Sequence, residues 1–113
     1  MRWILLLALL PAACSKGPEA DLASIGEARS LGAEWALVNE QAAKVHLTAI
    51  YAKTMRKALR QQLQTTSSSL TEPDSAYGKE IRALLAQPDD SAPAELRGHA
   101  AKLKSIEDQL ESA

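Results

Sequence analysis

Residues 25–45 read IGEARSLGAEWALVNEQAAKV, and this stretch decides the fold class of the chain. Its apolar residues recur at spacings of three and four, which is the period of one helix face and not the alternation of a strand. They are Ile25, Ala28, Leu31, Trp35, Val38, Ala42 and Val45. We therefore predict a long helix from about Ala20, with Trp35 in the core and a break near Lys44–Leu47. Gly26 and Gly32 weaken such a helix or let a neighbouring helix approach closely.

The segment after the break repeats the helical period. Thr48 is a suitable N-cap for a second helix, because its hydroxyl can accept a bond from a free backbone N–H. The apolar row of this helix is Leu47, Tyr51, Met55, Leu59 and Leu63, flanked by Ile50 and Ala58. Hydroxyl side chains in the run 65–69 compete for backbone hydrogen bonds and favour the end of the helix. Pro73 and Asp74 then indicate a turn.

Two further helices are predicted beyond this turn. The first is short, with Tyr77, Ile81, Leu84 and Leu85 as its apolar face. Residues 87–91 form a loop, and Ser91 is the predicted cap of the last helix. Pro93 lies in the first turn, where its missing N–H costs nothing. The apolar row of the last helix is Leu96, His99, Leu103, Ile106 and Leu110.

The composition agrees with a single helical domain. Of 113 residues 46% are apolar, only 4% are aromatic, and Phe is absent. Such a length supports one core. We predict an all-α fold over residues 21–113: a small antiparallel bundle of three long helices and one short helix. A three-helix coiled bundle or a self-associating hairpin would satisfy the same narrow stripes.

The N-terminus has the pattern of an export signal. Arg2 provides a positive charge, and residues 3–13 form an unbroken apolar stretch. As a helix this stretch would be about 16 Å long, shorter than a bilayer core of about 30 Å. It is therefore interpreted as a signal peptide over residues 1–13 and not as a permanent membrane span.

The end of this stretch, Leu10-Pro11-Ala12-Ala13-Cys14, resembles the lipobox of bacterial lipoproteins. Ala12 and Ala13 match the small residues before the cleavage site, and Cys14 matches the cysteine that is lipidated on sulfur. Pro11 departs from the pattern, since that position usually holds Leu. The alternative is an ordinary signal cleavage nearby, with Cys14 unmodified. Cys14 is the only cysteine, so no internal disulfide is expected.

The resemblance also implies where the protein resides. Residues 14–20 are predicted to be the lipidated Cys and a short tether, because the segment is polar and contains Gly and Pro. In lipoproteins of bacteria with two membranes, Asp directly after the Cys favours the inner membrane. Ser15 stands at that position, so the resemblance implies the outer membrane, facing the periplasm.

Charge is segregated along the chain. Residues 19–40 contain five acids and one base, residues 41–71 contain five bases and no acid, and residues 72–113 contain nine acids and five bases. Four cations are close together in the second helix: Lys53, Arg56, Lys57 and Arg60. They either pack between acidic neighbours or bind an anionic surface such as lipid head groups or an acidic protein. The net charge of −1 argues against a nucleic-acid partner.

Few residues suggest chemistry. His46 and His99 have no second His or Cys at metal-ligand spacing, so neither a metal nor a cofactor is expected. His99 is predicted to be partly buried and satisfied by a neighbour. The acids Glu107, Asp108 and Glu111 oppose the dipole of the last helix and are predicted to be solvated. The sequence thus predicts a non-enzymatic, lipid-anchored envelope module that binds a membrane surface or an envelope protein. The alternative is a helical inhibitor or regulator of a periplasmic enzyme.

Overall fold

A computed structural model describes residues 17–113, which form four helices and contain no strand. The helices are α2 (Pro18–Ala43), α3 (Ala49–Ser68), α4 (Ala76–Leu85) and α5 (Pro93–Ser112). Three are long and one is short, so the all-α prediction is confirmed. The predicted signal peptide and Cys14 lie outside the described residues.

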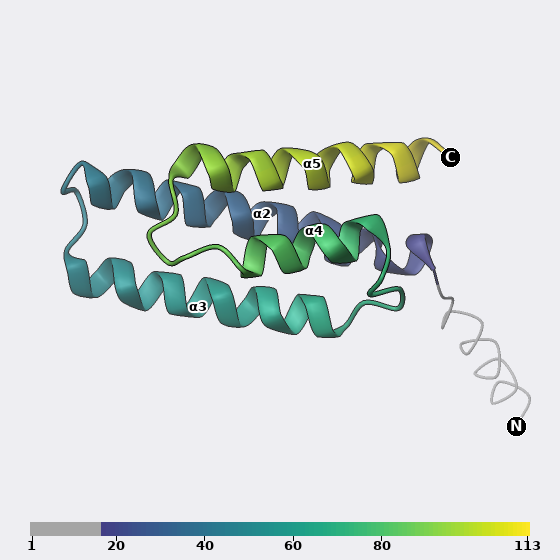
Figure 1. Cartoon of the computed structure of the whole chain (residues 1–113), viewed down its shortest axis with the longest axis horizontal. Coiled ribbons are helices and arrows are strands. Elements are labelled where there is room, and N and C mark those ends of the chain that lie inside the picture. Colours follow the sequence, from purple (N-terminus) through teal and green to yellow (C-terminus); the bar gives the residue numbers. More distant parts are fainter. Residues whose placement is uncertain (1–16) are drawn as a thin grey trace, which may run out of the picture.

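Successive helices run in opposite directions, and α2 is the central one (Figure 1). α2 packs against α5 along one side and against α3 along another, while the short α4 lies between α3 and α5. The backbones of α3 and α5 do not approach each other as closely as those of the other helix pairs. The described residues therefore form an antiparallel bundle. The short α4 lies between α3 and α5 over part of the length, and the loop that joins α4 to α5 continues from it (Figure 1).

The core is formed mainly by the predicted stripes. Trp35, Ile25 and Leu63 are fully buried, as are Ile81 and Leu84 from the short helix. Leu96 and Leu103 extend the core along α5. Burial of each such side chain stabilises the fold by about 1.5–3 kcal/mol before entropy is counted. The predicted placement of Trp35 in the core is confirmed.

Gly32 lets the helices approach closely, as one of the two alternatives predicted. A β-carbon at this position would lie 3.0 Å from Leu84 Cδ2 of α4 and 3.6 Å from Ala100 Cβ of α5. Such a contact is tighter than ordinary van der Waals packing, so the glycine serves the fit of three helices.

One of the two predicted caps is present, and the other is not. Thr48 Oγ1 accepts a bond from Tyr51 N at 3.1 Å, as predicted. The prediction that Ser91 caps α5 is wrong, because Ala92 is the N-cap and makes no side-chain bond. Ser91 Oγ instead donates to Gln87 Oε1 within the loop before the helix. Pro93 does begin α5, as predicted.

Several helix boundaries also differ from the prediction. α2 begins at Pro18, within the segment predicted to be tether, since Pro is favoured at the first helical position. α3 continues through the hydroxyl run to Ser68. The predicted apolar stripe includes Val45, but α2 ends before this residue and its side chain is exposed. Ile50 and Tyr51 also lie toward solvent, while Ala52 is buried in their place.

Candidate functional site

The four predicted cations all lie on α3, but the structure divides them into two pairs with different roles. Arg56 Nε donates to Asn39 Oδ1 of α2 at 2.7 Å. Arg60 donates to the carbonyl oxygens of Leu85 and Gln87, both at 2.8 Å. Both arginines therefore join α3 to other parts of the bundle.

Arg60 belongs to a network that holds the α4–α5 loop, and the sequence did not indicate this network. Its guanidinium carbon lies 5.0 Å from the centre of the Trp35 ring, and its Nε is 3.4 Å from Asp89 Oδ1. Trp35 Nε1 donates to the Asp89 carbonyl at 2.9 Å, and Asn39 Nδ2 donates to the carbonyls of Asp89 and Ser91. Asn39 lies one helical turn after Trp35 on the buried side of α2, and a polar residue at such a position is the sequence signal that could have indicated the network.

Lys53 and Lys57 form the second pair and have a different environment. Both side chains are exposed, and neither makes an ion pair within residues 17–113. Together with Arg60 they line a shallow open groove of about 410 Å³. Gln61, Gln64, Leu85 and Asp89 complete its lining. The groove is thus cationic at the α3 side and contains one carboxylate, Asp89, which is paired with Arg60.

The intramolecular explanation of the charge pattern applies only in part. The ion pairs of α2 are made mostly with α5: Arg29 with Glu107 at 2.8 Å, and Glu40 with Arg97 at 2.7 Å. Hydrogen bonding by Arg97 and the attraction of its charge lower the pKa of Glu40. The prediction that Glu107 is solvated is wrong, because Arg29 draws this carboxylate against α2.

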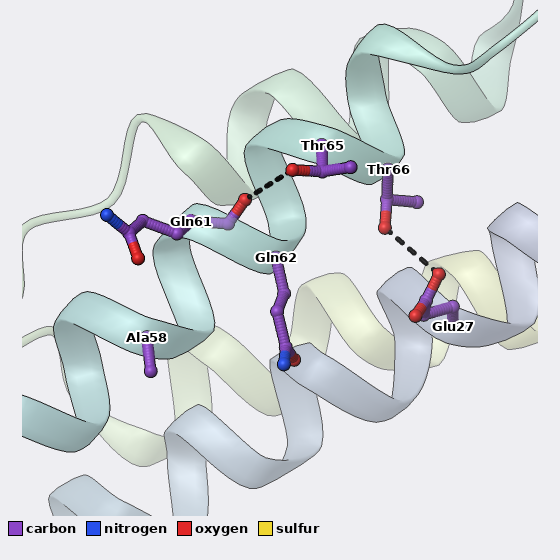
Figure 2. Close-up of a pocket in the computed structure, with 6 residues that line it drawn as sticks. All are labelled: Glu27, Ala58, Gln61, Gln62, Thr65 and Thr66. Atoms are coloured by element: carbon purple, nitrogen blue, oxygen red, sulfur yellow. Dashed lines mark hydrogen bonds between the residues drawn. The ribbon is translucent and has the colours of Figure 1, made fainter.

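A second hollow lies between α2 and α3 (Figure 2). It is lined by Glu27, Ala58, Gln61, Gln62, Thr65 and Thr66 and measures about 330 Å³. Thr66 Oγ1 donates to Glu27 Oε1 at 3.1 Å, and Thr65 Oγ1 donates to the Gln61 carbonyl. The hollow contains neither a histidine nor a cation, so its single carboxylate has no partner for acid–base chemistry.

Exposed apolar side chains gather where α2 passes into α3. Val45, Ile50 and Tyr51, here called the apolar tip, expose 84%, 80% and 51% of their surface. This end of the bundle is opposite to the end where α2 begins at Pro18 (Figure 1). Removing apolar side chains of this size from water is favourable. The apolar tip is therefore the part of the described surface where burial against a partner would be most favourable.

Buried polar groups elsewhere hold helices together. Asp21 at the start of α2 accepts bonds from Thr71 N, Thr71 Oγ1, Glu72 N and Tyr77 Oη. Burial opposes ionisation of Asp21, but the bonds from Thr71, Tyr77 and Glu72 outweigh it and lower its pKa. Burial and the bond to Asp21 raise the pKa of Tyr77 to about 12.

His99 is also satisfied by a neighbour, as predicted. Its Nδ1 pairs with Glu80 Oε2, which joins α5 to α4, and both side chains are mostly buried. No group of three or more His, Cys, Asp or Glu residues in the part of the chain that the structure describes is arranged to hold a metal ion.

Comparison of the chain with protein families, with curated proteins and with solved structures finds no match. None of the helices from Pro18 onward is long and apolar enough to cross a membrane.

Proposed function

We propose that this protein is a lipid-anchored, non-enzymatic interaction module of the bacterial cell envelope. The anchor is Cys14, and Ser15 favours the outer membrane, facing the periplasm. The helical body then serves to present a binding surface to the envelope. The lipobox residues support the anchor, and the surface of the bundle supports the interaction.

The observation that carries the proposal is the exposure of the apolar tip at the end of the bundle away from the anchor. Cys14 precedes Gly17 by three residues, which span at most about 10 Å. The anchor must therefore lie near the start of α2. The 26 residues of α2 extend over about 39 Å, so anchor and tip are at opposite ends of the body.

The titratable groups of the described bundle support a role without catalysis. Asp21, Tyr77 and the His99–Glu80 pair are largely enclosed, and each is hydrogen-bonded to a group from another helix or loop. A catalytic acid or base must face a substrate. Groups that already hold helices together are poorly placed for that task.

A helical inhibitor or regulator of a periplasmic enzyme is the second candidate. The apolar tip favours it, because three adjacent apolar side chains on a narrow end could fill a pocket of another protein. Addition of the purified protein to a murein hydrolysis assay tests it: a change in rate that disappears in an Ile50→Ser variant would support this candidate over the first.

The anchor is tested by fractionation of the full chain expressed in a bacterium with two membranes. We expect the wild-type protein in the outer membrane with a diacylglyceryl group on Cys14, seen by mass spectrometry of the N-terminal peptide. Ser15→Asp should move the protein to the inner membrane, and Ser15→Thr is its matched control. A Cys14→Ser variant that is still membrane-bound, together with an unmodified wild-type Cys14, would contradict the proposal.

A further inference from the structure

Val45 occupies a backbone position that normally belongs to glycine. After Ala43 ends α2, Val45 N donates to the Ala42 carbonyl at 3.0 Å and His46 N donates to the Gln41 carbonyl at 2.9 Å. These two bonds define a Schellman motif in which Val45 is the left-handed residue, with φ of 59°. A β-branched residue is disfavoured there. Because 84% of the surface of Val45 is exposed, packing offsets little of this strain, and the side chain is available for a contact outside the chain.

The free cations continue from the apolar tip along one face of α3. Ile50, Lys53 and Lys57 are spaced by three and four residues and therefore lie on the same side of the helix. Gln61 and Gln64 extend this face toward the end of α3. There is no acid anywhere in residues 41–71, and Asp89, the acid nearest to this face, is paired with Arg60.

The same face of α3 also leads back to the anchored end. Gly17 N donates to Thr71 Oγ1 at 3.0 Å, so the segment that follows α3 lies beside the start of α2. α3 itself is about 30 Å long. The anchor, the two lysines and Ile50 of the apolar tip can therefore all touch one flat surface when the bundle lies on its α3 side.

We propose that the face of α3 that carries Ile50, Lys53 and Lys57 docks on an anionic phospholipid surface, with Ile50 at the apolar tip inserted at the interface and Lys53 and Lys57 over the lipid phosphates. The anchor alone is one attachment, and this face supplies a second at the far end of the body. The resulting orientation rests on the proposed lipidation of Cys14, whereas the affinity of the face for lipid does not.

The chemistry of the free cations favours lipid over an acidic protein. The two arginines, whose planar forks suit defined carboxylate partners, are used inside the bundle. The two residues left free are lysines, whose compact flexible charges suit a mobile layer of phosphates. Tyr51 is half-exposed in the first turn of the same helix, and tyrosine favours the boundary between apolar and aqueous phases.

The test uses the full chain, purified from its envelope and reconstituted in vesicles of phosphatidylcholine with or without phosphatidylglycerol. An environment-sensitive fluorophore is placed on Ala49→Cys beside the apolar tip, and on Ser105→Cys of α5 as the control. We expect a blue-shifted emission and protection from iodide at position 49 only with phosphatidylglycerol, and at position 105 in neither vesicle.

Variants then separate charge from insertion. Lys53→Gln with Lys57→Gln should lower the ratio of docked to undocked protein by about 25-fold, since each lysine near an anionic surface contributes about fivefold. Lys102→Gln with Lys104→Gln makes the same change of charge on α5 and should leave the ratio unchanged. Ile50→Ser should abolish the protection at position 49 without altering the fold seen by circular dichroism.

The outcomes that would overturn the inference are distinct from failure of the anchor. If iodide quenches the fluorophore at position 49 as strongly as the one at position 105 in anionic vesicles, docking on lipid is refuted. If the fluorophore at position 49 is accessible in vesicles and is protected only in the native envelope, the face binds a protein partner instead. Mass spectrometry of the N-terminal peptide reports lipidation of Cys14 separately, and lack of lipid there refutes the proposed function alone.

Discussion

The buried Asp21 carboxylate accepts four hydrogen bonds, and Asp21→Asn tests its role in stability. Oδ1 accepts Thr71 N at 2.9 Å, while Oδ2 accepts Thr71 Oγ1 and Glu72 N at 3.1 Å and Tyr77 Oη at 2.6 Å. These bonds tie the first turn of α2 to the α3–α4 loop and to α4. The substitution keeps the size of the side chain and removes its charge and one acceptor.

The expected cost follows from this geometry. The hydroxyls of Thr71 and Tyr77 can rotate to accept from an amide, but two backbone N–H groups then share a single oxygen. One unpaired N–H costs about 1–3 kcal/mol, and the remaining bonds weaken because the acceptor is no longer charged. We expect Asp21→Asn to lower the free energy of unfolding by about 2–4 kcal/mol. For a domain of this size the Tm falls by about 10–25 °C.

Urea unfolding followed by circular dichroism measures this change, and its pH dependence tests the cause. The native pKa of Asp21 is lowered, so the unfolded chain binds the proton first as pH falls. The stability from the carboxylate is complete above the ordinary range of Asp and is lost as pH falls through the native pKa. The difference between wild type and Asp21→Asn should therefore shrink in acid. Asp74→Asn, at an exposed acid of the same loop, is the control, and a cost of Asp21→Asn equal to that control would refute the reasoning.

Three further predictions concern single positions. Gly78→Ala should destabilise the protein by about 3 kcal/mol or more, because a β-carbon would overlap the Pro73 carbonyl. Gly98 has open space around it, so Gly98→Ala should stabilise the protein by about 1 kcal/mol. Equal effects of the two substitutions in thermal unfolding would contradict both predictions. Val45→Gly should raise the urea midpoint, because it relieves about 1–2 kcal/mol of left-handed strain and the greater entropy of glycine in the unfolded chain offsets only part of this. A lowered midpoint would show that Val45 is not strained. The pKa of Tyr77 is raised to about 12, so the contribution of its hydroxyl to stability is complete below pH 10 and is lost as pH rises toward 12. The free energy of unfolding, measured against pH, should show wild type approaching Tyr77→Phe between pH 10 and 12. Parallel curves for the two proteins would contradict this prediction.

The sequence alone determined the helices and most of the core. The spacing of Ile25, Trp35 and their neighbours is a local property, because a helix repeats within a few residues whatever surrounds it. The same holds for the cap at Thr48, whose donor is three residues away. The number, order and type of elements could therefore be inferred from periodicity and breakers.

Only the tertiary structure decided which polar groups are structural and which are free. Arg56, Arg60, Lys53 and Lys57 are adjacent on one helix, and their spacing does not distinguish them. What distinguishes them is the position of Asn39 on α2 and of the α4–α5 loop, which take up the two arginines and leave the two lysines exposed. An acid near the start of a helix is favoured by the helix dipole, yet the hydrogen-bond partners of Asp21 lie about fifty residues further along the chain. Hydrogen bonds between such distant segments depend on how the helices pack, and no local pattern in the sequence encodes that packing.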